Sequence, residues 1–185
     1  MYRRAVRSFL FVVSSARAGG NTERLARIAA RSLPAADTQT WLRLTDHPLE
    51  PFADTRHSTG YVAPTGNAKL LCDATLAATD LVIVAPVYWY GFPWPLALYL
   101  DHWSAWMRIK ELAFMDTLKG RALHAVVVDS DDEKEGSSLP LIDSLRRTAV
   151  YTNMTWHGAL TGHGNRPGDV ETDAAALAAA ATYFA

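Results

Sequence analysis

A run of small and polar residues near the start of the chain has the composition of a phosphate-binding loop. It reads Ser14-Ser15-Ala16-Arg17-Ala18-Gly19-Gly20-Asn21-Thr22. Small residues such as Gly20 let the backbone approach an anion, and a helix beginning at the end of the run would add the partial positive charge of its N-terminus. Ser15, Asn21 and Thr22 can donate side-chain hydrogen bonds, and Arg17 can add a full charge. The alternative interpretation is a surface turn that only caps a helix.

The glycine spacing of this run argues against two classes of nucleotide ligand. The run lacks the G-x-x-x-x-G-K-S/T pattern of nucleoside triphosphatases and the G-x-G-x-x-G pattern of dinucleotide sites. A phosphate monoester is therefore the better expectation.

A second run is rich in aromatic residues. It reads Pro86-Val87-Tyr88-Trp89-Tyr90-Gly91-Phe92-Pro93-Trp94-Pro95. The aromatic side chains offer flat faces for a planar ring, and Gly91 permits close backbone approach. The alternatives are an aromatic cluster that packs beneath a helix and an interface between subunits.

Alternating strands and helices must position these two runs. Apolar runs predict strands at 6–13, 39–44, 81–84, 123–128 and 155–160. Helical spacing and proline positions predict helices at 21–32, 68–78, 96–107, 139–149 and 172–185. This alternation indicates one α/β domain over 1–185, with a parallel sheet and helices on both faces. In the doubly wound strand order 2-1-3-4-5, the turns after the first and third strands face each other, so both runs would serve one ligand.

The two runs also resemble the motifs of a known family. Residues 15–22 resemble the S-x-R-x-x-G-N-T phosphate loop of the NADPH-dependent FMN reductase-like branch of the flavodoxin-like superfamily. Residues 86–101 resemble its P-V-Y-W loop and the helix that follows, and weaker similarity continues at 118–121 and 158–160. The resemblance implies a flavodoxin-like three-layer sandwich, so we expect a five-stranded parallel sheet of order 2-1-3-4-5. It also implies bound FMN, reduction by NADH or NADPH, and commonly a homodimer or homotetramer.

The resemblance also assigns roles to residues. The phosphate is expected at Ser15, Arg17, Gly20, Asn21 and Thr22, and the ring at Pro86, Val87, Tyr88, Trp89, Tyr90 and Gly91. Substrate-side candidates are Phe92, Trp94 and His102. No side chain needs to act as acid or base, because flavin N5 carries the hydride. The expected reaction is a ping-pong transfer of electrons to a flavin, quinone, azo or nitro compound. The alternatives are an FMN-carrying electron shuttle without NAD(P)H activity and a flavin-free interaction protein.

Composition excludes several other classes. Eighteen Lys and Arg residues against nineteen Asp and Glu residues give a net charge of -1, so we expect neither nucleic acid nor a membrane as partner. The single cysteine, Cys72, excludes an internal disulfide, and the six histidines lack metal-ligand spacing. The apolar run at 9–13 is too short for a signal peptide, so we expect a cytoplasmic protein.

The segment Asp129–Gly136 departs from the family, which tends to have small residues there. Its five acidic residues oppose one lysine. A solvated loop is one interpretation. The other is that these carboxylates lower the reduction potential of a nearby flavin.

Overall fold

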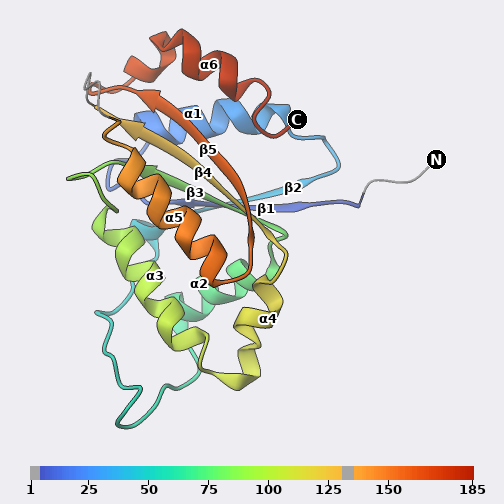
Figure 1. The fold of residues 1–185 in the computed structure, drawn as a ribbon, viewed down its shortest axis with the longest axis vertical. Helices are drawn as coiled ribbons and strands as arrows, with labels where there is room; N and C mark the ends of the chain where they lie inside the picture. The colour runs from blue at the N-terminus through green and yellow to red at the C-terminus, as the bar shows by residue number, and fades with distance from the viewer. Residues whose placement is uncertain (1–4, 131–135) are drawn as a thin grey trace.

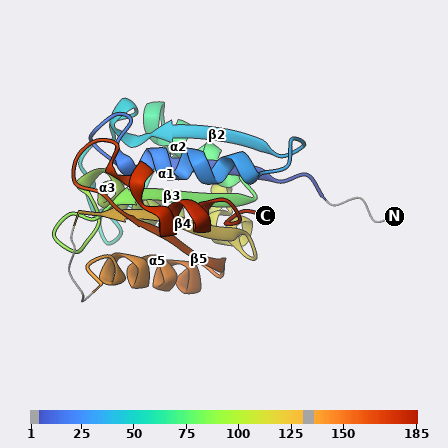
Figure 2. The ribbon, with the colours of Figure 1, turned by 90° about the horizontal axis from the view of Figure 1, so that it is seen from above.

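Five parallel strands form a single sheet in the computed structural model, which describes residues 5–130 and 136–185 (Figure 1). The strands are β1 (Ser8–Val13), β2 (Thr38–Arg43), β3 (Asp80–Pro86), β4 (Ala122–Asp129) and β5 (Thr155–His163). Their order is β2-β1-β3-β4-β5, which confirms the predicted order. Figure 2 shows β2 at one edge of the sheet and β5 at the other.

Helices cover both faces of this sheet. They are α1 (Asn21–Ala29), α2 (Gly66–Ala77), α3 (Trp94–Trp106), α4 (Phe114–Leu118), α5 (Leu139–Tyr151) and α6 (Ala174–Ala180). Helices α1 and α6 pack on one face, and the other four supply the core on the opposite face (Figure 1). Within the described ranges, no helix is long and apolar enough to cross a lipid bilayer.

A hydrophobic core lies on each face of the sheet, which explains why the sequences of the central strands are continuous apolar runs. In β3, Leu81 and Ile83 point into the core beneath α2 and α3, whereas Val82 and Val84 point into the core beneath α1 and α6. Side chains alternate between the faces of a strand, so a strand covered on both sides must be apolar at every position. The one charged residue of β3, Asp80, therefore lies at the end of the strand.

The structure corrects several element boundaries. Helix α3 begins at Trp94 rather than at residue 96, because Pro95 fits the first turn of a helix. The short helix α4 was not predicted. The last helix covers only Ala174–Ala180, capped by the Asp173 carboxylate, which accepts from the Ala176 N–H. Strand β5 continues past residue 160 to His163, and this extension brings His163 opposite Asp129.

Candidate functional site

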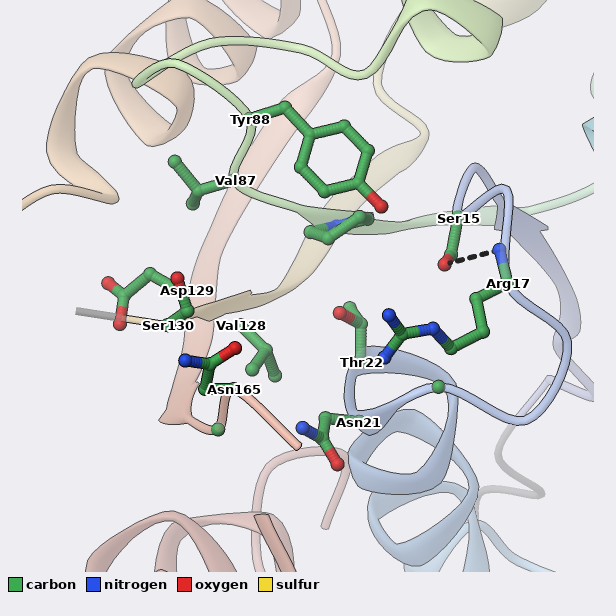
Figure 3. A pocket seen from close by; sticks show the side chains of 13 residues that line it. Ser15, Arg17, Asn21, Thr22, Val87, Tyr88, Val128, Asp129, Ser130 and Asn165 are labelled. Carbon is green, nitrogen blue, oxygen red and sulfur yellow. Dashed lines mark hydrogen bonds between the residues drawn. The ribbon is translucent and has the colours of Figure 1, made fainter. Parts of the chain in front are cut away.

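A pocket lies where β1, β3, β4 and β5 end, at the carboxyl edge of the sheet (Figure 3). Its lining consists of Ser15, Arg17, Gly20, Asn21, Thr22, Pro86, Val87, Tyr88, Val128, Asp129, Ser130, Gly164 and Asn165. The first and third βα loops thus meet around one pocket, as the strand order requires. The segments 128–130 and 164–165 complete the lining. The sequence interpretation placed the segment that begins at Asp129 near a flavin as one of two hypotheses, and it assigned no ligand to 164–165.

One end of the pocket carries hydrogen-bond donors that could hold an anion. The Arg17 guanidinium group makes no hydrogen bond or ion pair with any residue in the described ranges, and Figure 3 shows it turned toward Thr22. The Thr22 side chain is buried, and its hydroxyl also lacks a partner there. Gly20 caps α1 without a side-chain hydrogen bond, so no capping side chain occupies the first N–H groups of the helix, whose residues Asn21 and Thr22 line the pocket. This donor set suits a phosphate group.

Ser15 and Asn21 are used differently from Arg17 and Thr22. The Ser15 hydroxyl oxygen accepts from the Arg17 N–H at 3.1 Å. The Asn21 side chain donates to the Arg166 carbonyl at 2.8 Å and accepts from the Gly168 N–H at 2.8 Å. Asn21 therefore lines the pocket but ties helix α1 to the loop after β5, which leaves its amide fewer hydrogens for a ligand.

Arg43 and Glu23 hold the phosphate-binding loop in shape. Arg43, at the end of β2, donates to the Arg17 carbonyl at 3.1 Å and forms an ion pair with Glu23. Glu23 also accepts from the Gly19 N–H at 3.0 Å. Burial raises the pKa of Glu23, but its hydrogen bonds to Arg43 and Arg27 outweigh burial and lower the pKa overall. Arg43 and Glu23 are twenty positions apart, and no local motif joins them, so the sequence interpretation did not include these supporting contacts.

The aromatic loop forms the other side of the site. Val87 and Tyr88 line the main pocket, and Trp89 and Tyr90 line an adjoining pocket that shares Val87 and Asp129 with it. Trp89 is 96% exposed, so it contributes little to the protein core. Its ring is therefore available to a ligand or a partner.

Trp89 and Tyr90 sit at the tip of a tight hairpin turn with strained backbone. The Gly91 N–H donates to the Tyr88 carbonyl at 3.0 Å, and Trp89 and Tyr90 have φ values of 50° and 63°. Turns with positive φ at both central residues favour Asn-Gly, because a left-handed conformation costs an ordinary residue about 1–2 kcal/mol. Such strain is found mainly at functional sites.

Replacing Trp89-Tyr90 with Asn-Gly should raise the free energy of unfolding by about 1–2 kcal/mol, because it relieves this strain and removes little buried surface. Urea denaturation measures the change. The matched control replaces both residues with alanine, which removes the aromatic rings but keeps the strain. An Asn-Gly variant no more stable than the double-alanine variant would contradict the interpretation.

The remaining aromatic-loop candidates lie outside both pockets. Gly91 lines neither pocket, Phe92 packs against the core, and Trp94 is exposed at the start of α3. The structure does not bring His102 to the site, because its Nε2 bonds to the Glu50 carbonyl at 2.9 Å. On α3, two turns beyond the loop, His102 instead holds the segment between β2 and α2.

The acidic segment is only partly described. Asp129 is 5% exposed, so the interpretation of a solvated loop is wrong for this residue. Residues 131–135 lie outside the described ranges, and the redox effect expected of them stays a prediction.

Comparison with known proteins is consistent with this geometry. A family model described as the flavodoxin-like fold matches residues 7–184. A protein of Bacillus subtilis (strain 168), named as the NAD(P)H-dependent FMN-containing oxidoreductase YwqN, is 31% identical over 166 residues, which cover 89% of each chain.

Solved structures show the same architecture. The Trp repressor binding protein from Bacillus subtilis is 25% identical, with a TM-score of 0.76 over 96% of this chain and 97% of that chain. An FMN-dependent NADH-azoreductase from Bacillus anthracis str. Ames Ancestor, in complex with FMN, is 11% identical, with a TM-score of 0.65 over 95% of this chain and 96% of that chain. At that identity, the second likeness concerns the fold alone.

Proposed function

The chain belongs to the family of proteins with a flavodoxin-like fold, and from that premise we propose that it binds FMN and oxidises NADH or NADPH. The observation that carries the proposal is the pair of donors, Arg17 and Thr22, beside the N-terminus of α1, which have no partner within residues 5–130 and 136–185. They lie in the same pocket as the aromatic loop, so one ligand with a phosphate and a planar ring would satisfy both ends. FMN has this chemistry.

The lining residues divide naturally between the two parts of FMN. Arg17, Thr22 and the α1 N-terminus would hold the phosphate, whose negative charge they complement. Val87 and Tyr88 would cover one side of the ring, and the segment 128–130 the other (Figure 3). The carboxylate of Asp129 disfavours a phosphate at its own end, so the pocket admits FMN in one orientation.

A bound flavin would supply the redox chemistry, accepting hydride from a nicotinamide and passing electrons on. The protein anchors the phosphate, orients the ring and limits the access of water. The adjoining pocket, lined by Trp89 and Tyr90, is open to solvent and would receive the nicotinamide and the acceptor in turn. We therefore propose a ping-pong reaction with a planar small-molecule acceptor: a flavin, quinone, azo or nitro compound.

We also propose that copies of the chain associate as a homodimer or homotetramer. Large aromatic side chains are exposed around the site: Tyr88, Trp89, Tyr90 and Trp94. Aromatic residues are enriched in protein interfaces. Their position would place the interface beside the ring end of the pocket.

Initial-rate kinetics test the proposed reaction. The FMN-loaded protein should oxidise NADPH or NADH with a soluble quinone, and double-reciprocal plots at several quinone concentrations should be parallel. Intersecting lines would contradict the ping-pong order. An FMN-loaded protein that oxidises neither nicotinamide would contradict the enzyme and favour an electron carrier.

A further inference from the structure

A buried carboxylate lies between the two pockets. Asp129 ends β4, lines both pockets and is 5% exposed. One of its oxygens accepts from the Ser137 hydroxyl at 2.9 Å, and the other accepts from Nδ1 of His163 at 2.5 Å. Its main-chain carbonyl accepts from the Gly164 N–H at 2.9 Å. The carboxylate is therefore fixed in place beside the proposed ring position.

His163 connects this buried charge to solvent. It ends β5 directly opposite Asp129 in the sheet register, and its side chain is 61% exposed. An ionised carboxylate only accepts hydrogen bonds, so Nδ1 of His163 carries a hydrogen. The basic nitrogen is then Nε2, where the ring can take up a second proton.

Other charged groups surround the pair. The Asp173 carboxylate accepts from the His163 main-chain N–H at 2.9 Å and from the Ala176 N–H at 2.9 Å. Asp169 accepts from two main-chain N–H groups of the loop after β5. Arg17 faces Asp129 from the other side of the pocket (Figure 3). The sequence has four acids and one lysine at 131–135, which lie outside the described ranges.

Resting on the proposed function, we propose that the Asp129–His163 pair takes up one proton whenever a flavin ring bound in the pocket receives two electrons. Hydride from the nicotinamide carries two electrons and one proton to the ring, and the oxidised nicotinamide leaves. The ring then bears additional negative charge beside Asp129. A proton from solvent binds Nε2 of His163 and balances this charge; it returns to solvent or to the acceptor when the electrons leave.

The physical reason is electrostatic. An added negative charge favours the protonated form of a neighbouring imidazole. The Asp129 carboxylate lies between the pocket and the His163 imidazole, and because it is buried, solvent screens its interactions only weakly. His163 itself lines neither pocket, so it acts through Asp129 as a charge-setting residue. Its exposure allows exchange with solvent without opening the pocket.

The pH dependence of the midpoint potential of the bound FMN tests the coupling. Each additional proton taken up with two electrons steepens the fall of potential with pH by about 30 mV per unit. The wild-type potential should therefore fall more steeply with pH than that of His163→Gln by about this amount. Because His163 is exposed, this variant should fold.

Two further variants sharpen the test. Asp129→Asn should lose the same additional slope, because it removes the carboxylate that joins His163 to the pocket. His157→Gln, the same change at an exposed position of β5 away from the pocket, should retain the wild-type slope. If the midpoint potential of bound FMN has the same pH slope in wild type and His163→Gln from about pH 5 to 9, the coupling is contradicted and FMN binding is not. A protein that retains no FMN would instead contradict the proposed function.

Discussion

Replacing Arg17 with alanine is expected to lower the affinity for FMN by about 10- to 100-fold, because a hydrogen bond to a charged group is worth about 1.5–3 kcal/mol. The Arg17 guanidinium group lines the pocket and has no partner among the residues described, so its charge is available to a phosphate. The affinity for riboflavin, which lacks the phosphate, should stay unchanged. Fluorescence titration with each flavin measures both affinities.

The control for this prediction is another arginine near the start of α1. Arg24 forms an ion pair with Glu171 and does not line the main pocket. Arg24→Ala should therefore bind FMN as the wild type does. Equal losses of FMN and riboflavin affinity in Arg17→Ala, or equal losses of FMN affinity in both variants, would contradict the assignment of the phosphate to Arg17.

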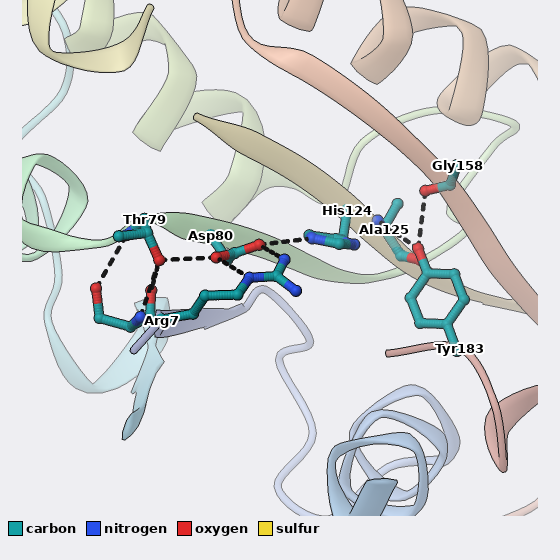
Figure 4. A network of polar contacts seen from close by, with 8 residues as sticks. Arg7, Thr79, Asp80, His124, Ala125, Gly158 and Tyr183 are labelled. Atoms are coloured by element: carbon teal, nitrogen blue, oxygen red, sulfur yellow. Dashed lines mark hydrogen bonds and ion pairs between the residues drawn. The ribbon is translucent and has the colours of Figure 1, made fainter. Parts of the chain in front are cut away.

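Replacing Asp80 with alanine is expected to lower the free energy of unfolding by about 3 kcal/mol, because it removes a buried carboxylate and leaves the half-buried Arg7 and the buried His124 without their acceptor. Asp80 begins β3, at the opposite end of the sheet from the pocket, and is 2% exposed. Its carboxylate accepts from Arg7, from the Thr79 hydroxyl at 2.7 Å and from Nε2 of His124 at 3.0 Å (Figure 4). Asp46→Ala, at an exposed position, is the control. Urea denaturation giving equal losses in the two variants would contradict a structural role for the cluster.

The same cluster predicts how stability depends on pH. Burial lowers the pKa of His124, and its Nδ1 has no partner among the described residues. His124 therefore takes up a proton near pH 6.5 in the unfolded chain and only at lower pH in the folded chain. The free energy of unfolding falls as the pH drops below about 6.5. Burial raises the pKa of Asp80, but the hydrogen bonds of His124 and its other partners outweigh burial and lower it overall. Its stabilisation is present above about pH 4 and is lost below.

Denaturation curves at several pH values check this dependence. Between about pH 7 and 5, His124→Gln should lose less stability than the wild type, because glutamine binds no proton. An equal loss would show that other groups control the acid sensitivity.

The fold and the two main loops of the site could be predicted from the sequence for physical reasons. A strand covered on both faces must be apolar throughout, so 81–84 identified the central strand, and β3 lies there. Runs such as 15–22 and 86–91 are continuous in sequence, so their residue composition could be recognised without the structure. Strand order then brought them together, and eight of the predicted cofactor residues line one pocket.

The parts that could not be predicted depend on contacts between distant segments. Arg43 supports the Arg17 backbone from β2, and Asn21 bonds to Arg166 across 145 positions. Asp129 meets His163 only because β5 extends beyond residue 160 and pairs with β4 in one particular register. His102 was a substrate-side candidate because it lies near the aromatic loop in sequence. In the structure it lies on α3, two turns beyond the loop, and contacts the Glu50 carbonyl instead of the pocket.

The most direct test of FMN binding is the visible absorption spectrum of the purified protein after FMN is added and free flavin is removed by gel filtration. We expect a flavin spectrum that stays with the wild-type protein and is weaker with Arg17→Ala, because Arg17 and the other donors at that end of the pocket hold the phosphate. A wild-type protein that emerges colourless would contradict FMN binding and the oxidoreductase activity proposed from it, while leaving the flavodoxin-like fold intact.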